Sequence, residues 1–139
     1  MEQMNTLDFP VRLDAAVIDC LDVKALAQFY AQLLGWNVVQ CSSDWASIAS
    51  PEGGCRLSFQ KNEVYQPPVW PEEAGKPQQQ MHLDFAVPDS KALHQAVEYA
   101  ISLGAKKTDA QYAEAETGNA DDWVTLLDPQ GHPFCFVVW

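Results

Sequence analysis

The residues best suited to chemistry in this chain are His82 and Asp84, which stand two positions apart in the segment 81–87. Apolar residues occupy the alternate positions of this segment, so its pattern predicts a β-strand. Side chains two positions apart share one face of a strand, with Cα atoms about 6.5–7 Å apart. A nearby carboxylate raises the pKa of an imidazole and favours its cation. The pair is therefore suited to general-acid chemistry or to holding an anion.

The residues leave three interpretations of His82 open. It is a pocket residue held by hydrogen bonds, an acid or base working with Asp84, or a metal ligand together with Asp84, Cys135 or Asp19. Cys135 is either a small core residue or a nucleophile. The sequence favours the core residue, because no cation is placed to activate the thiol for nucleophilic attack. For Asp19 the alternatives are ligand contact and bracing of the turn that follows it.

A seven-residue repeat indicates which elements position these residues. Residues 22–28 (DVKALAQ) recur as residues 89–95 (DSKALHQ), with five of seven positions identical. Each copy follows an alternating strand, begins at an Asp suited to cap a helix, and runs to a glycine, Gly35 or Gly104. Each then leads to a strand that begins with Trp. The repeat predicts two copies of one βαβββ unit.

The pattern predicts a single domain over residues 1–139, consisting of two units and a connection. The first unit covers about 13–61, a linker or lid covers 62–80, and the second unit covers about 81–139. The linker is rich in proline and carries two large aromatic residues. Helices are expected between Asp22 and Gly35 and from 89 or 90 to about 103. The buried face expected of the second helix consists of Leu93, Ala96, Val97, Ala100 and Ile101. Strands are expected at 13–20, 36–40, 45–49, 56–61, 81–87, 123–127 and 133–139, with a short strand and an acidic loop within 105–120.

Alternation along the strands also predicts where a ligand would bind. The fully apolar faces should lie under the helices, which leaves the mixed faces together on the other side of the sheet. Polar and aromatic lining on a concave sheet is typical of a small-molecule pocket. The tryptophans and Tyr65 have the alternative roles of filling the cup or a dimer interface. The predicted ligand-binding residues are Asp19, Trp45, Ser58, Gln60, Tyr65, Trp70, His82, Asp84, Trp123 and Cys135, with His82 and Asp84 as the candidate catalytic pair.

Composition and charge exclude several classes of function. The 139 residues carry a formal charge of −11, from 19 acidic and 8 basic side chains. Such a surface repels phosphate backbones and anionic lipids, so we expect no nucleic-acid and no membrane partner. The four cysteines form no CxxC pair and no zinc pattern, which favours reduced thiols in a cytoplasmic protein. The first nine residues lack the basic flank and apolar run of a signal peptide.

Two stretches resemble a known superfamily when taken together, FYAQLLGW at 29–36 and DPQGHPFC at 128–135. They resemble the glyoxalase-like small-domain proteins of the vicinal oxygen chelate superfamily, which includes glyoxalase I, extradiol dioxygenases and bleomycin-resistance proteins. The resemblance covers about residues 13–139. It implies an α+β fold of two tandem βαβββ modules that form a half-open barrel, or cup, and it implies a homodimer.

The resemblance also implies four metal-ligand positions. One lies at the start of the first strand of each module, and one lies near the end of the last strand of each module. In this chain they fall on Ala15, His82, Cys135 and Ser58, or Leu57 if the register slips by one. Only His82 is a usual ligand, and Ala15 has no donor atom. We therefore predict no metal and no cofactor, with a divalent ion on a non-standard set as the alternative.

Two functions follow from these observations, and the sequence leaves open whether the protein is an enzyme. The first is a small-molecule-binding protein that holds a small, partly aromatic ligand in the cup. The alternative is a lyase, isomerase or dioxygenase that uses a non-standard metal site or the His82/Asp84 acid–base pair. Convergence of His82, Asp84 and Cys135 would favour the enzyme, and aromatic side chains between them would favour the binding protein.

Overall fold

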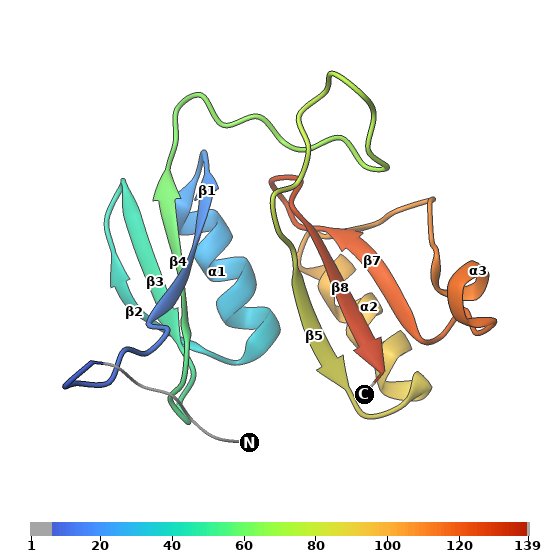
Figure 1. The fold of residues 1–139 in the computed structure, drawn as a ribbon, viewed down its shortest axis with the longest axis horizontal. Coiled ribbons are helices and arrows are strands. Elements are labelled where there is room, and N and C mark those ends of the chain that lie inside the picture. Colours follow the sequence, from blue (N-terminus) through green and yellow to red (C-terminus); the bar gives the residue numbers. More distant parts are fainter. Residues whose placement is uncertain (1–6, 139) are drawn as a thin grey trace.

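The computed structural model describes residues 7–138, which form two units with the same order of elements (Figure 1). The repeat thus predicted the architecture, and the βαβββ order is confirmed in both units, with one extra short helix in the second. The first unit contains β1 (Ala15–Cys20), α1 (Val23–Leu34), β2 (Asn37–Cys41), β3 (Trp45–Ala49) and β4 (Arg56–Lys61). The second contains β5 (Leu83–Val87), α2 (Ser90–Ser102), β6 (Lys106–Lys107), α3 (Ala113–Thr117), β7 (Trp123–Leu127) and β8 (Pro133–Val138).

Each unit forms one four-stranded mixed sheet. The strand orders are β1-β4-β3-β2 in the first sheet and β5-β8-β7-β6 in the second. In both, the first strand pairs in parallel with the last, and the other neighbours are antiparallel. The two units therefore share topology as well as sequence, and the predicted α+β fold of tandem modules is confirmed.

Both long helices begin at the repeated aspartate. The Asp22 carboxylate accepts a hydrogen bond from the Ala25 amide at 3.0 Å, and Asp89 accepts one from Ala92 at 2.7 Å. These bonds satisfy amides that the first helical turn leaves without partners. Gly35 ends α1 in the left-handed conformation, as the sequence predicted. No helix within residues 7–138 has both the length and the apolar character needed to cross a bilayer.

The two units share one hydrophobic core. Helix α1 lies against β2, β3 and β4, and α2 lies against all four strands of its own sheet. The apolar strand faces point toward these helices. From α1, the Phe29 ring lies 6.0 Å from Phe134, and the Tyr30 ring lies 6.1 Å from Phe85. Aromatic contacts thus join the helix of the first unit to the sheet of the second.

Several local details differ from the sequence predictions. Strand β1 begins at Ala15 rather than at 13, and β2 covers Asn37–Cys41 rather than 36–40. Strand β5 begins at Leu83 rather than at 81, because its partner β8 begins with Pro133, which has no amide to extend the ladder. The acidic loop contains the five-residue helix α3, whose Ala and Glu residues are good helix formers. Ile101, predicted on the buried face of the second helix, is exposed. The predicted strand end at Trp139 lies outside the described residues.

The linker crosses between the two units at the top of Figure 1. The Tyr65 hydroxyl donates to the Gln130 carbonyl at 3.1 Å, and the Tyr65 ring stacks on His132 at 4.9 Å. Further along, the Trp70 ring lies 6.1 Å from Tyr112. The linker is therefore held against the second unit by its aromatic side chains.

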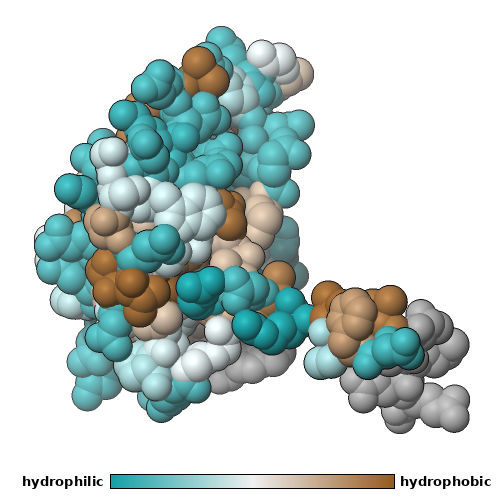
Figure 2. Space-filling model, turned by 90° about the vertical axis from the view of Figure 1, so that its left-hand side faces the viewer, coloured by the Kyte–Doolittle hydropathy of each residue, from teal (hydrophilic) through white to brown (hydrophobic). Residues whose placement is uncertain are grey.

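The segment before β1 projects from the body of the molecule (Figure 2). Its apolar residues stand at alternate positions, and Phe9, Val11 and Leu13 are 60–74% exposed. Exposed apolar side chains at a two-residue spacing have the pattern of a strand that lacks a covering surface.

Candidate functional site

His82, Asp84 and Cys135 lie together on the second sheet. His82 immediately precedes β5, and Asp84 on β5 is paired in register with Cys135 on β8. The His82 Nε2 atom is 3.2 Å from an Asp84 carboxylate oxygen. Ligating atoms of all three residues lie within 4.8 Å of one another. The structure therefore brings together the catalytic pair proposed from sequence and adds Cys135 to it, which is the convergence expected of an enzyme.

Cys135 is buried, and its thiol is in contact with Thr125. The Thr125 Oγ1 lies 3.3 Å from the Cys135 Sγ. Burial raises the pKa of the Cys135 thiol, the Thr125 hydrogen bond opposes this rise, and the Asp84 charge adds to it. A thiol with a raised pKa is a poor nucleophile, so this environment does not suit covalent catalysis by Cys135.

Gln111 supports this part of the site, and the sequence analysis missed it. Its Nε2 donates to the Thr125 carbonyl at 2.8 Å, and the Thr125 amide donates to its Oε1 at 2.9 Å. Gln111 thus fixes the backbone beside Cys135 from the segment before α3. The only sequence signal was an uncharged amide in an otherwise acidic stretch.

The corresponding face of the first sheet has no titratable group at these positions. Ala15 and Val17 occupy β1 where the second unit has His82 and Asp84, and Ser58 on β4 pairs with Val17. The Ser58 hydroxyl is 2.8 Å from that of Ser47, and both residues are buried. The Trp45 indole donates to Ser47 at 3.1 Å. Two of the predicted ligand-binding residues, Trp45 and Ser58, are thus bonded to Ser47, and these positions carry hydroxyls where the second sheet carries titratable groups.

The Asp19 carboxylate is bound by two side-chain amides. Gln60 Nε2 donates to one oxygen at 2.6 Å, and Asn62 Nδ2 donates to the other at 3.3 Å. Asn62 begins the linker, so Asp19 braces the chain where it leaves β4. The Asp19 carboxylate thus braces the end of β4 rather than the turn that follows Asp19; Asp19 also borders the cavity described next, and its contact with a ligand stays a prediction.

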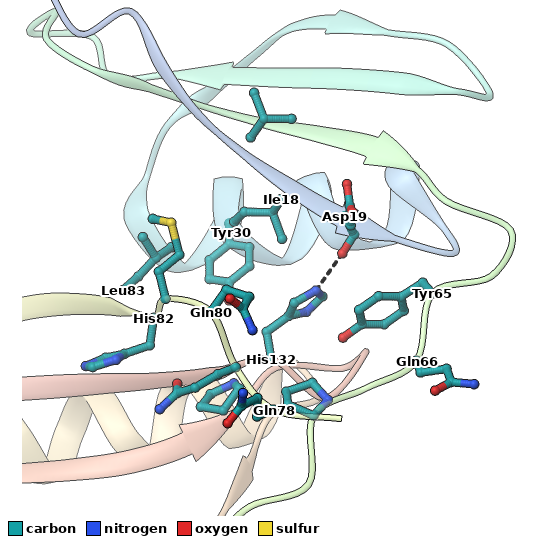
Figure 3. Close-up of a pocket in the computed structure, with 15 residues that line it drawn as sticks. Ile18, Asp19, Tyr30, Tyr65, Gln66, Gln78, Gln80, His82, Leu83 and His132 are labelled. Atoms are coloured by element: carbon teal, nitrogen blue, oxygen red, sulfur yellow. Dashed lines mark hydrogen bonds between the residues drawn. The ribbon is translucent and has the colours of Figure 1, made fainter. Parts of the chain in front are cut away.

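A cavity of about 340 Å³ lies between the two units, next to the linker (Figure 3). It brings together three predicted site residues, Asp19, Tyr65 and His82, with His82 and Tyr65 toward opposite ends. Trp45, Ser58, Gln60, Trp70, Asp84, Trp123 and Cys135 are not part of its lining. The lining that sequence analysis missed includes Tyr30, Gln66, Gln78, Gln79, Gln80 and His132.

The cavity wall combines aromatic rings with uncharged amides. Among its lining residues within the described chain there is no Lys or Arg. The Gln79 Oε1 atom is buried without a hydrogen-bond partner, as is the indole nitrogen of Trp70 outside the lining. A buried polar atom without a partner is costly, and a ligand that donates a hydrogen bond would relieve this cost at Gln79.

His132 joins the second unit to the first at one end of the cavity. Its Nδ1 lies 2.8 Å from Asp128, and its Nε2 lies 2.7 Å from the Asp19 carbonyl oxygen (Figure 3). Burial lowers the pKa of His132, but the hydrogen bond and charge of Asp128, together with Asp19, outweigh this and raise it overall. Because both ring nitrogens face acceptors, the geometry suits the imidazolium cation.

Asp128 is the buried centre of this contact. Its side chain also accepts a hydrogen bond from the Tyr30 hydroxyl at 2.7 Å. Burial and the Asp128 charge raise the pKa of Tyr30 well above its usual value, so the phenol stays neutral and donates. The carboxylate is therefore held by Tyr30 and His132, one from each unit.

The turn around these residues, 128–132, docks on the junction between β1 and α1. The amides of Leu21 and Asp22 donate to the Gln130 Oε1, and the Gln130 Nε2 donates to the Asp22 carbonyl. At Gly131 an added Cβ would come within 2.8 Å of Pro67, so the linker passes too close for a larger residue. Most of the DPQGH stretch thus serves contact between units.

A metal set shared between the two modules does not fit this chain. Ala15 has no donor atom, and the Ser58 hydroxyl is buried in its bond to Ser47. A divalent ion needs several donors aimed at one point. Within the described residues, the clustered His, Cys and acidic donors are His82, Asp84 and Cys135, which all belong to the second module.

Paired βαβββ sheets with a polar face opposite the helices define a protein of the glyoxalase/bleomycin-resistance/dioxygenase fold. The chain belongs to the glyoxalase-like domain family, whose model matches residues 15–137. The predicted membership of the vicinal oxygen chelate superfamily is therefore confirmed.

Solved structures from several bacteria share this fold. A glyoxalase/bleomycin resistance protein/dioxygenase family enzyme from Burkholderia phytofirmans PsJN is 23% identical, with 92% of this chain and 98% of that chain covered and a TM-score of 0.67. Protein ATC0852 from Agrobacterium tumefaciens is 20% identical, with 94% and 98% covered and a TM-score of 0.67.

A glyoxalase-related enzyme from Fulvimarina pelagi is 16% identical, with 92% of this chain and 88% of that chain covered and a TM-score of 0.65. A comparison with curated proteins found no match. At these identities the structural likeness establishes the fold, and the ligand has to be argued from the site.

Proposed function

We propose that the protein binds a small, partly aromatic molecule in the cavity between its two modules. The observation that carries this proposal is the cavity of about 340 Å³ with Tyr30 and Tyr65 in its wall. Its volume is at the lower end of the range for small-molecule sites, and its mixture of aromatic and amide groups is typical of them. Binding in this cavity needs no metal.

The lining supports a neutral ligand that donates hydrogen bonds. Gln66, Gln78 and Gln80 offer amide oxygens and nitrogens, and the Gln79 Oε1 lacks a donor. The positive charge favoured at His132 is matched by Asp128, and no Lys or Arg of the lining is present to bind an anion. A carboxylic acid would therefore leave its charge unpaired in a partly apolar site.

Calorimetric titration tests this proposal with matched probes. Neutral bicyclic aromatic amides should bind, and carboxylic acids of the same skeleton should bind at least about tenfold more weakly, which is about 1.4 kcal/mol. Gln80→Leu should weaken the amides, whereas Gln95→Leu on the exposed side of α2 should not. Equal binding to both variants, or tighter binding of the acids, would contradict the proposed site.

Catalysis is a second candidate, favoured by the convergence of His82, Asp84 and Cys135 within 4.8 Å. Figure 3 shows His82 at the end of the cavity opposite Tyr65, so His82 is the member of the pair that a ligand in the cavity meets, and Asp84 is not in the lining. The family resemblance implies a lyase, isomerase or dioxygenase that acts on two adjacent oxygens. Turnover of vicinal dioxygen compounds that disappears in Asp84→Asn would support this candidate, and turnover unchanged by the variant would remove it.

The remaining proposals concern assembly and location. We propose a homodimer, supported by the exposed alternate apolar residues Phe9, Val11 and Leu13 on the projecting arm. Light scattering after size-exclusion chromatography should give twice the mass of 15.5 kDa, and a monomer would refute the proposal. Free thiols at all four cysteines support a reducing, cytoplasmic location.

A further inference from the structure

We propose that His82, Asp84 and Cys135 form a metal site that is built from the second module alone and prefers Zn²⁺ to harder divalent ions. The inference goes beyond ligand binding in the cavity and does not depend on it. His82 and Cys135 stand at two of the four ligand positions that the family resemblance implies, but Asp84 does not, and the first module contributes no ligand.

The three donor atoms are close to the spacing that a shared ion requires. They lie within 4.8 Å of one another, and His82 Nε2 is 3.2 Å from Asp84 Oδ1. Donors around a tetrahedral zinc ion at about 2.0–2.3 Å are roughly 3.3–3.8 Å apart. The His82 and Asp84 side chains are 42% and 54% exposed, so they are free to move the remaining distance toward the buried thiol.

The thiol is the fixed member of the set. Cys135 lies on the central strand β8, paired with Asp84 on one side and with Thr125 on the other. The Thr125 hydroxyl contacts its Sγ, and Gln111 holds the Thr125 backbone. Outer hydrogen bonds of this kind orient metal ligands and tune their affinity.

The donor types select the metal. Imidazole nitrogen and thiolate sulfur suit Zn²⁺, whereas Mg²⁺, Ca²⁺ and Mn²⁺ favour sites built from oxygen alone. On coordination the Cys135 thiol releases its proton to solvent, and thiolate plus carboxylate then balance the two positive charges of the ion. Three protein ligands leave a fourth position for water, as in open zinc sites.

Metal titration of the untagged full-length chain tests the proposal. Zn²⁺, measured by competition with a chromogenic chelator, should bind once per chain. Co²⁺ should give tetrahedral visible absorption together with a thiolate-to-cobalt charge-transfer band in the near ultraviolet. Cys135→Ser should abolish the charge-transfer band, and Asp84→Asn and His82→Ala should each weaken Zn²⁺ by more than about tenfold.

The chain supplies matched controls. His94 and Asp121 form another histidine–carboxylate pair, at 3.3 Å, and Cys41 is an exposed thiol outside the cluster. His94→Ala and Cys41→Ser should leave the binding unchanged. Asp84→Asn changes an exposed side chain and decides the matter if Cys135→Ser does not fold. Absence of stoichiometric Zn²⁺ binding, a missing charge-transfer band in the wild type, or equal affinity in Asp84→Asn would overturn the proposal.

Discussion

The two modules place different chemistry on the same backbone. In the first, the Ser47 and Ser58 hydroxyls pair at 2.8 Å; in the second, Thr125 and Cys135 pair at 3.3 Å in the equivalent strands. Beside them, the first module has Ala15 and Val17 where the second has His82 and Asp84. The duplicated fold therefore fixes a pair of hydrogen-bonding groups in each sheet, and a few side chains decide which sheet carries reactive groups.

The modules also differ in how they use the turn before their last strand. Residues 50–54 of the first module are mostly exposed and make local bonds within the turn. Residues 128–132 of the second module dock on the first through His132, Asp128 and Gln130. One turn is thus a surface loop, and its counterpart holds the two modules together beside the cavity.

The largest effect should come from breaking this docking at Asp128. Asp128→Ala leaves the buried Tyr30 hydroxyl and the His132 ring without their partner. Loss of one partner of a buried charged pair costs about 3–5 kcal/mol, so urea unfolding should show a decrease of that size. The matched change Glu52→Ala in the exposed turn should cost less than about 0.5 kcal/mol. Equal effects would mean that the two turns are not used differently.

A smaller loss is expected at Gln130. Its side chain makes three hydrogen bonds to the backbone of Leu21 and Asp22, all near the surface where water replaces them. We expect Gln130→Ala to lower the unfolding free energy by about 1–2 kcal/mol. Chemical denaturation measures this, and a change below about 0.5 kcal/mol would show that water substitutes fully for the amide.

The docking should also weaken as the pH rises. The folded-state pKa of His132 is raised above its ordinary value of 6.5, so the protonated ring stabilises the fold fully below about pH 6.5. This contribution is lost as the pH rises through the folded pKa, with a slope of at most about 1.4 kcal/mol per pH unit. Wild type should lose more stability between pH 6 and pH 9 than His132→Gln. Parallel pH profiles would refute a charged His132.

The sequence predicted the local parts of this comparison. The bounds of β3, β4 and β7, the Asp22 and Asp89 caps, and the shared face of His82 and Asp84 all follow from short-range periodicity or capping. Whether these residues bind a ligand stays a prediction. Ile101 was misplaced because it lies at the edge of the apolar stripe, where helical spacing alone does not decide burial.

The docking of the modules could not be predicted in the same way. Gln130 bonds to residues more than a hundred positions earlier, and Trp70 of the linker meets Tyr112 of the second unit. Neither contact has a spacing signal, because both join segments that are far apart in the sequence and meet only in the folded chain. The same holds for the glutamines that line the cavity, which belong to a polar linker segment without periodicity.

The smallest change in stability comes from transplanting the second module's side chains into the first. Ala15→His, Val17→Asp and Ser58→Cys place the proposed ligands on the equivalent strands. Val17 is 46% exposed and accepts a carboxylate, and Cys replaces Ser58 with little change in volume. We expect the unfolding free energy to change by about 1 kcal/mol. Co²⁺ titration should then rise from one ion per chain to two, with Ala15→His alone staying at one. If the triple variant also stays at one, the contacts that support the second module's ligands, such as those of Gln111 with Thr125, distinguish the modules more than the ligands themselves do.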